Sequence, residues 1–122
     1  MQNKIYTSYF ANIRKLPEDI IPIAICGKCP PNWIGLSYPK LAPKKSFFWE
    51  WKKNNDNNYY IEHFQKEVLN LLNPQETVKE LYLLSKNKNI ALICYEAPDK
   101  FCHRHLVAEW LNKNGFDAEE YK

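Results

Sequence analysis

Residues 89–111 constrain the fold of this chain more than any other segment. They begin with a continuous apolar run at residues 90–93, which is typical of a strand covered on both faces of a sheet. Turn-forming residues follow at 97–99, where a proline restricts φ and lacks an amide hydrogen. From Cys102 onward the apolar residues return at helical spacing. The segment therefore predicts a buried strand, a short connection and an amphipathic helix.

The first turn of this predicted helix carries a thiol, an imidazole and a guanidinium group, from Cys102, His103 and Arg104. They lie at the carboxyl end of the strand, where open α/β sheets bind ligands. The first amide groups of a helix lack intrahelical partners and attract anions, and the same field favours the thiolate form of cysteine. An arginine at this position is either solvated or holds a carboxylate or phosphate.

Two interpretations of this cluster remain open. In the structural one, Glu96 and Arg104 form an ion pair that holds the loop, while Cys102 and His103 are buried for packing. In the functional one, Arg104 binds the phosphate or carboxylate of a ligand. Cys102 is then the nucleophile, and His103 or Glu96 is the acid or base. A phosphatase loop of the Cys-x₅-Arg kind is excluded, because no arginine lies six residues after either Cys94 or Cys102.

A first strand is predicted at residues 4–10, and the hydroxyl groups at its end are further candidates for this cleft. The alternative is that these hydroxyl groups only cap the backbone. The candidate ligand-binding residues besides Arg104 are Cys94, Tyr95, Thr7, Ser8 and Tyr9.

The cysteines bear on the compartment and on metal content. The first ten residues lack the apolar region of a signal peptide, so we expect a cytoplasmic protein with free thiols or a metal site. Cys26 and Cys29 follow a predicted strand at 20–26 and precede two prolines, which disfavours a thioredoxin-like redox motif. These two thiols could instead form half of a zinc site. The candidates for its second half are Cys94, Cys102, His103 and His63.

Residues 31–58 contain several prolines and an asparagine-rich run, and they predict a long irregular segment that acts as a lid or binding loop. Within it, residues 47–51 (FFWEW) lie between two lysine pairs and form the one local mixture of basic and aromatic residues. So many aromatic rings must pack on the domain or on a partner. They either cover one side of the sheet or roof the cleft and stack on a base or ring.

The remaining elements complete an alternating pattern. Helices are predicted at 59–72, from 73 to about 87 and at 102–114, and a last strand at 116–121. The alternation predicts one α/β domain over residues 1–122, with three layers, a mostly parallel sheet and helices on both faces. No stretch of 18 apolar residues exists, which argues against a membrane span, and the net charge of +3 is too small to indicate nucleic-acid binding alone.

Three segments resemble domain of unknown function family 488. LICYEAPDKFCHRHLVAEWL resembles its C-terminal signature, a hydrophobic strand, Cys-x-Glu, a short loop and Cys-His-Arg on a helix. The segments IYTSYFANIRKL and LSYPKLAP also resemble that family. The resemblance implies a fold and a site at the Cys-His-Arg turn, without an established reaction.

Two functional hypotheses follow from these observations. The first is a small enzyme or binding protein whose cleft takes a phosphorylated ligand, either a small molecule such as a nucleotide or a nucleic acid. The second is a non-catalytic module that binds zinc through Cys26 and Cys29 and contacts another macromolecule through residues 47–51.

Overall fold

The computed structural model describes residues 4–96 and 100–121. Its sheet has five parallel strands in the order β3-β2-β4-β1-β5. The strands are β1 (Ile5–Tyr9), β2 (Ile20–Ala24), β3 (Leu36–Ser37), β4 (Asn89–Cys94) and β5 (Ala118–Glu120). The central position of β4 explains why residues 90–93 are apolar without interruption, since all four are fully buried. The predicted α/β class and parallel sheet are confirmed, and the turn predicted at 97–99 lies outside the described residues.

Four α-helices and three 3₁₀ helices connect these strands within residues 4–96 and 100–121. The α-helices are α1 (Lys45–Asn54), α2 (Asn57–Glu67), α3 (Pro74–Leu84) and α4 (His103–Lys113). The 3₁₀ helices are η1 (Phe10–Lys15), η2 (Pro39–Leu41) and η3 (Leu69–Leu71). Local signals set several of their ends: the Asn73 side chain caps α3, and Gly115, with a φ of 90°, follows α4.

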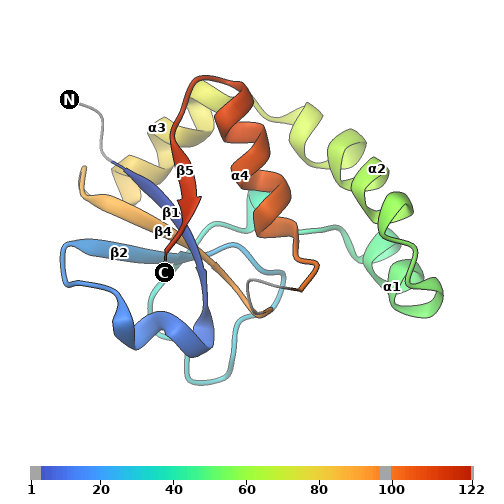
Figure 1. Ribbon diagram of the computed structural model, residues 1–122, viewed down its shortest axis with the longest axis horizontal. Coiled ribbons are helices and arrows are strands. Elements are labelled where there is room, and N and C mark those ends of the chain that lie inside the picture. Colours follow the sequence, from blue (N-terminus) through green and yellow to red (C-terminus); the bar gives the residue numbers. More distant parts are fainter. Residues whose placement is uncertain (1–3, 97–99, 122) are drawn as a thin grey trace.

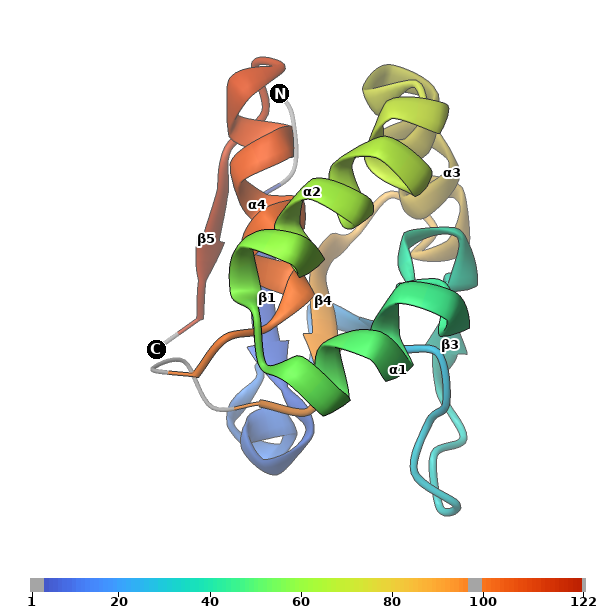
Figure 2. The ribbon, with the colours of Figure 1, turned by 90° about the vertical axis from the view of Figure 1, so that its right-hand side faces the viewer.

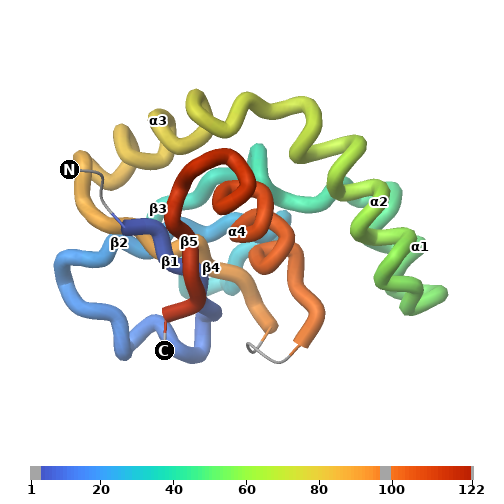
Figure 3. The backbone as a smooth tube through the Cα atoms, turned by 45° about the horizontal axis from the view of Figure 1, so that its top comes forward, coloured from blue at the N-terminus to red at the C-terminus, as the bar shows by residue number. Residues whose placement is uncertain are grey.

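The four α-helices share one face of the sheet. Ile90 and Leu92 of β4 pack in one core cluster with buried residues from all of these helices. Ala91 and Ile93 point the other way, into a cluster that Phe10 of η1 covers. Figures 1 and 3 show the same division, with the α-helices on one side of the strands and η1 on the other. Helices were expected on both faces of the sheet. The structure has the four α-helices on one face and the 3₁₀ helix η1 on the other.

Residues 31–58 are more regular than the sequence suggested. They contain β3, η2, α1 and the start of α2, so the prediction of a long irregular segment is wrong. Phe47 and Trp51 are four residues apart and therefore lie on one side of α1, where Phe47 is fully buried. Asn55 ends this helix in the left-handed conformation. Proline and asparagine content overestimated the irregularity of this segment because several of these residues lie at the ends of the elements, as Pro39 does in η2, Asn54 in α1 and Asn57 in α2.

Within the described residues, none of the helices has the length and the apolar character that crossing a bilayer requires. Figure 2 shows that α1, α2 and α4 lie in front of β1 and β4. Helix α1 thereby approaches the carboxyl end of β4, where the candidate site lies.

Candidate functional site

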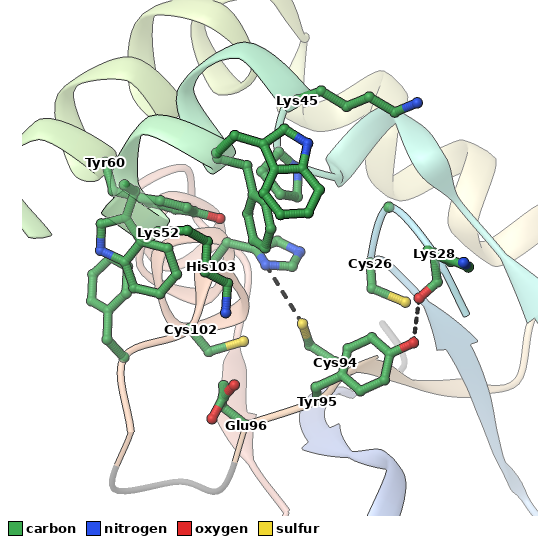
Figure 4. A pocket seen from close by; sticks show the side chains of 16 residues that line it. Cys26, Lys28, Lys45, Lys52, Tyr60, Cys94, Tyr95, Glu96, Cys102 and His103 are labelled. Carbon is green, nitrogen blue, oxygen red and sulfur yellow. Dashed lines mark hydrogen bonds between the residues drawn. The ribbon is translucent and has the colours of Figure 1, made fainter. Parts of the chain in front are cut away.

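A pocket of about 610 Å³ opens at the carboxyl ends of β2 and β4. Its lining includes Cys26 beyond β2, Cys94 at the end of β4, and Cys102 and His103 at the start of α4. Helix α1 contributes Trp49, Trp51, Lys45 and Lys52 to the opposite wall. Figure 4 shows the sulfur atoms and the imidazole ring gathered on one side of this pocket.

The imidazole ring of His103 is held in one orientation. Its Nε2 lies 2.7 Å from the carbonyl oxygen of Ile25, and its Nδ1 lies 3.5 Å from Cys94 Sγ. A carbonyl oxygen can only accept, so Nε2 carries a proton and donates it, and Nδ1 faces the sulfur atom of Cys94. The ring of Phe64 packs against the imidazole at 5.6 Å.

Cys94 and Cys102 form a coupled, buried pair of thiols. The hydrogen bond from Cys94, with further contributions from His103 and the backbone amide of Arg104, holds the pKa of Cys102 well below its usual value. The same hydrogen bond, together with burial, raises the pKa of Cys94 well above its usual value. The coupling therefore favours the thiolate form at Cys102, the N-cap residue of α4, over that at Cys94.

Arg104 is fully buried and has a different partner from the one expected. Its Nε and Nη2 donate to the two carboxylate oxygens of Glu120 at 3.1 and 3.0 Å. Glu96 contributes only its backbone carbonyl oxygen, which accepts from Nη1. The ion pair between Glu96 and Arg104 in the structural interpretation is therefore wrong, because β5 brings the carboxylate of Glu120 to the guanidinium group. Arg104 is also not among the described residues that line the pocket.

Of the hydroxyl groups of β1, that of Thr7 belongs to this buried network, whereas that of Ser8 has a separate partner in η1. Thr7 donates to Glu120 at 2.6 Å, and Ser8 accepts from Asn12 at 3.4 Å. The guanidinium carbon of Arg104 lies 5.5 Å from the centre of the Tyr9 ring. Among the described residues, the pocket lining includes none of these β1 side chains, so their contact with a ligand stays a prediction.

The second cysteine pair, Cys26 and Cys29, lies beside the first. Its sulfur atoms are 3.9 Å apart, and burial raises the pKa of Cys26 to about 12. Cys26 packs with both Cys94 and Cys102 in one cluster. His63 does not join them, since its Nδ1 lies 2.5 Å from the Glu67 carboxylate on α2.

The part of the chain that the structure describes contains one group of at least three residues able to share a metal ion: Cys94, Cys102 and His103. Their ligand atoms all lie within 4.8 Å of one another, and all three residues are buried. The predicted metal residues Cys26 and Cys29 are outside this group.

Of the predicted site residues, the pocket therefore brings together Cys26, Cys94, Tyr95, Glu96, Cys102 and His103. Tyr95 also donates its hydroxyl hydrogen to the Lys28 carbonyl oxygen, which ties the end of β4 to the loop after β2. The sequence left open whether the aromatic residues 47–51 cover the sheet or roof the cleft, and the pocket wall includes Trp49 and Trp51. The lysines of this basic–aromatic mixture that line the pocket are Lys45 and Lys52. For Lys28, which also lines the pocket, the sequence contains no indication of a role at the site beyond its position between two cysteines.

The fold and the pocket define a class of protein: an α/β domain with a thiol–imidazole cluster at the carboxyl edge of a parallel sheet. The family model DUF488-N3a, described as the active DUF488-N3 subclade, matches residues 11–115. The chain therefore belongs to this DUF488 family, as its three segments predicted. No curated protein and no solved structure matches the chain.

Proposed function

We propose that the protein is an enzyme that acts on a phosphorylated, ring-bearing ligand of the nucleotide class. The observation that carries this proposal is the composition of the pocket, which combines an aromatic wall, lysine side chains and a buried sulfur–imidazole cluster. Ligand sites with this combination use apolar walls for affinity and a few polar groups for orientation.

The aromatic wall suits a flat ring. Trp49 lines the pocket and is 60% exposed, so its indole face is available for stacking. Phe48, Trp51 and Phe101 extend the same wall. Stacking on aromatic side chains contributes about 1–3 kcal/mol per base and tolerates different bases.

The cationic part of the pocket suits a phosphate group. Lys52 lines the pocket, and its Nζ lies over the Phe48 and Trp51 rings at 5.5 and 5.4 Å from their centroids. Its side chain points toward Cys102 and Glu96, whereas Lys45 extends away from them (Figure 4). The N-terminus of α4 faces the same space and favours negative charge. A phosphate would therefore lie between Lys52 and the start of α4.

The reacting end of the ligand would then lie over the cluster of sulfur and nitrogen atoms. Cys102 supplies an electron pair from its sulfur, and the lone pair of His103 Nδ1 faces the same cluster. Glu96 lines the pocket with an exposed carboxylate that can exchange protons with solvent. We assign the catalytic roles to these three residues and an orienting role to Cys94 and Tyr95.

Isothermal titration calorimetry with adenosine monophosphate, adenosine and inorganic phosphate tests this proposal. We expect the monophosphate to bind more tightly than either fragment. Lys52→Ala should weaken monophosphate binding about tenfold, because it removes a charge-assisted contact. The matched control is Lys53→Ala, which removes an exposed lysine that does not line the pocket. Equal affinities of both lysine variants and the parent protein would contradict the proposed phosphate position.

Trp49→Ala should weaken binding of the monophosphate and of adenosine by about 1–3 kcal/mol, since the base loses its stacking surface. It should leave the weak binding of inorganic phosphate unchanged, because no ring is involved. Failure of all nucleoside monophosphates to bind would overturn the proposed function.

A second candidate function is a metal-binding interaction module built on Cys26 and Cys29. The 3.9 Å separation of their sulfur atoms favours it, because two thiolates on one zinc ion lie at a similar distance. This function predicts that a chelator unfolds the protein, as followed by circular dichroism. A protein that stays folded with the chelator, and whose Cys26→Ser variant keeps any bound metal, would exclude it.

A further inference from the structure

We propose that Cys94, Cys102 and His103 are the three protein ligands of a divalent transition-metal ion of the zinc type, whose fourth position faces the pocket. This inference rests on the proposed function and deepens it, because it names a cofactor for the reacting end of the site. With the ion bound, Cys102 and His103 act as its ligands rather than as nucleophile and base, and Glu96 keeps the role of acid or base. It differs from the metal site expected at Cys26 and Cys29.

The distances within the cluster are close to those that a metal ion requires. Sulfur atoms bound tetrahedrally about 2.3 Å from a zinc ion lie about 3.8 Å apart. Cys94 Sγ and His103 Nδ1 are 3.5 Å apart, and no two ligand atoms in the cluster are farther apart than 4.8 Å. Shifts of about 1 Å or less in side-chain positions would therefore suffice to form the tetrahedral site.

The surroundings of His103 are those of a metal-bound histidine. Such a histidine donates its second ring N–H to a carbonyl or carboxylate, which fixes the tautomer and the ring orientation. His103 Nε2 donates to the Ile25 carbonyl oxygen at 2.7 Å, so Nδ1 is left to bind the ion. The Phe64 ring packs on the imidazole and restricts its rotation.

The elements that carry the ligands hold them in place. Cys94 ends β4, the central strand of the sheet, and Cys102 is the N-cap residue of α4. All three ligand residues are about 5% exposed, so the ion would be held in a largely dry environment. Sites on strands and helices position their ligands more accurately than sites on loops.

The donor set and the open side of the cluster indicate what kind of ion binds there. Two thiolates and one imidazole are soft and intermediate donors that select zinc over magnesium or calcium. Three protein ligands and one open position are typical of catalytic rather than structural zinc sites. The three residues all line the 610 Å³ pocket, so a ligand or a water molecule could occupy the fourth position.

Cobalt(II) substitution tests this site, because cobalt bound by thiolates in a tetrahedral site absorbs strongly in the visible range. We expect one ion per chain with this spectrum, displaced by zinc. Cys94→Ser, Cys102→Ser and His103→Gln should each weaken cobalt binding more than about 100-fold. Loss of a group that only hydrogen-bonds to a metal ligand already lowers metal affinity about 10–100-fold. Added imidazole should change the spectrum by occupying the open position.

Two variants serve as matched controls. The double variant Cys26→Ser/Cys29→Ser removes the neighbouring thiols, and His63→Gln removes a histidine that Glu67 already engages. Both should keep the spectrum and the affinity. A signal that disappears in the double cysteine variant and persists in Cys94→Ser would place the ion at Cys26 and Cys29 and overturn the inference.

A measurement on the unmodified protein covers the case in which the ligand variants do not fold. Bound zinc should slow alkylation of Cys94 and Cys102 by iodoacetamide at least tenfold, as read by peptide mass spectrometry, and leave Cys29 reactive. Equal alkylation with and without zinc would overturn the metal site. Adenosine monophosphate binding is measured on the same zinc-free sample. If the nucleotide binds while alkylation is equal with and without zinc, the metal site is excluded and the proposed function stands.

Discussion

Arg104 is the residue whose environment departs most from that of an ordinary surface charge. It is the largest fully buried side chain among the described residues. Glu120, the Glu96 carbonyl oxygen and the face of the Tyr9 ring surround its guanidinium group. The residue therefore joins the start of α4 to β1, to β5 and to the chain beyond β4. A buried charge of this kind is tolerated only while its partners remain in place.

Glu120→Ala should lower the free energy of unfolding by about 3–5 kcal/mol, because it leaves the guanidinium group buried without a carboxylate. Glu96→Ala should change it by less than about 0.5 kcal/mol, since only the backbone of Glu96 contacts Arg104. Urea unfolding followed by circular dichroism measures both values. The control Glu119→Ala removes an exposed carboxylate from the same strand. Equal losses from Glu96→Ala and Glu120→Ala would contradict the assignment of Glu120 as the partner.

At the scale of elements, polar contacts with Glu80 join the segment before α1 to α3. The Tyr38 hydroxyl donates to the Glu80 carboxylate, and Lys40 reaches the same carboxylate at 3.2 Å. The Tyr38 hydrogen bond, followed by that of Lys40, lowers the pKa of Glu80. This contact joins residues 42 positions apart in the sequence and holds η2 and the approach to α1 against α3.

The contribution of Glu80 to stability should depend on pH. A carboxyl group whose pKa is lowered by folding stabilises the protein above its unfolded pKa of about 4.3, and this contribution is lost as the pH falls through the folded value. Tyr38→Phe should therefore lower the urea midpoint at pH 7, and the difference from the parent protein should shrink toward pH 3. Urea unfolding at pH 7, 5 and 3 measures it. A difference that stays constant with pH would show that only packing is lost.

At the scale of the whole molecule, the one-sided helix layer builds the core and the pocket from the same side chains. Phe64 of α2 is fully buried, and its ring contacts Phe47 of α1, Tyr60 and His103. The core cluster is therefore continuous with the wall of the pocket. Changes in packing between α1, α2 and the sheet should therefore change the position of the His103 imidazole, because Phe64 contacts it.

Phe64→Ala should lower the free energy of unfolding by about 3–5 kcal/mol, as expected for a large buried ring that leaves a cavity. It should also weaken the binding of adenosine monophosphate, because His103 loses the ring that restricts it. The control Leu83→Ala removes a side chain that is 68% exposed, and its effect should stay within about 0.5 kcal/mol. Thermal unfolding and calorimetry measure the two effects. Loss of stability with unchanged ligand affinity would show that the packing of Phe64 in the core does not affect ligand binding in the pocket.

The sequence by itself determined the types and order of the main elements around the site. The apolar run at 90–93, the helical spacing after Cys102 and the cap at Asn73 depend on near neighbours, so they could be recognised without a structure. The same local pattern placed Cys94, Glu96, Cys102 and His103 at one edge of the sheet. The Cys-His-Arg turn also indicated the family to which the chain belongs.

Only the tertiary structure decided which groups meet at that edge and beneath it. The hydrogen bond between His103 and Ile25 spans 78 positions, and that between Thr7 and Glu120 spans 113. The first contact depends on the pairing of β2 with β4 and the second on the pairing of β1 with β5, and no local pattern reports either pairing. Strand pairing therefore assigned Glu120 rather than Glu96 to Arg104. The packing of the α-helices on one face made α1, rather than an irregular lid, a wall of the pocket.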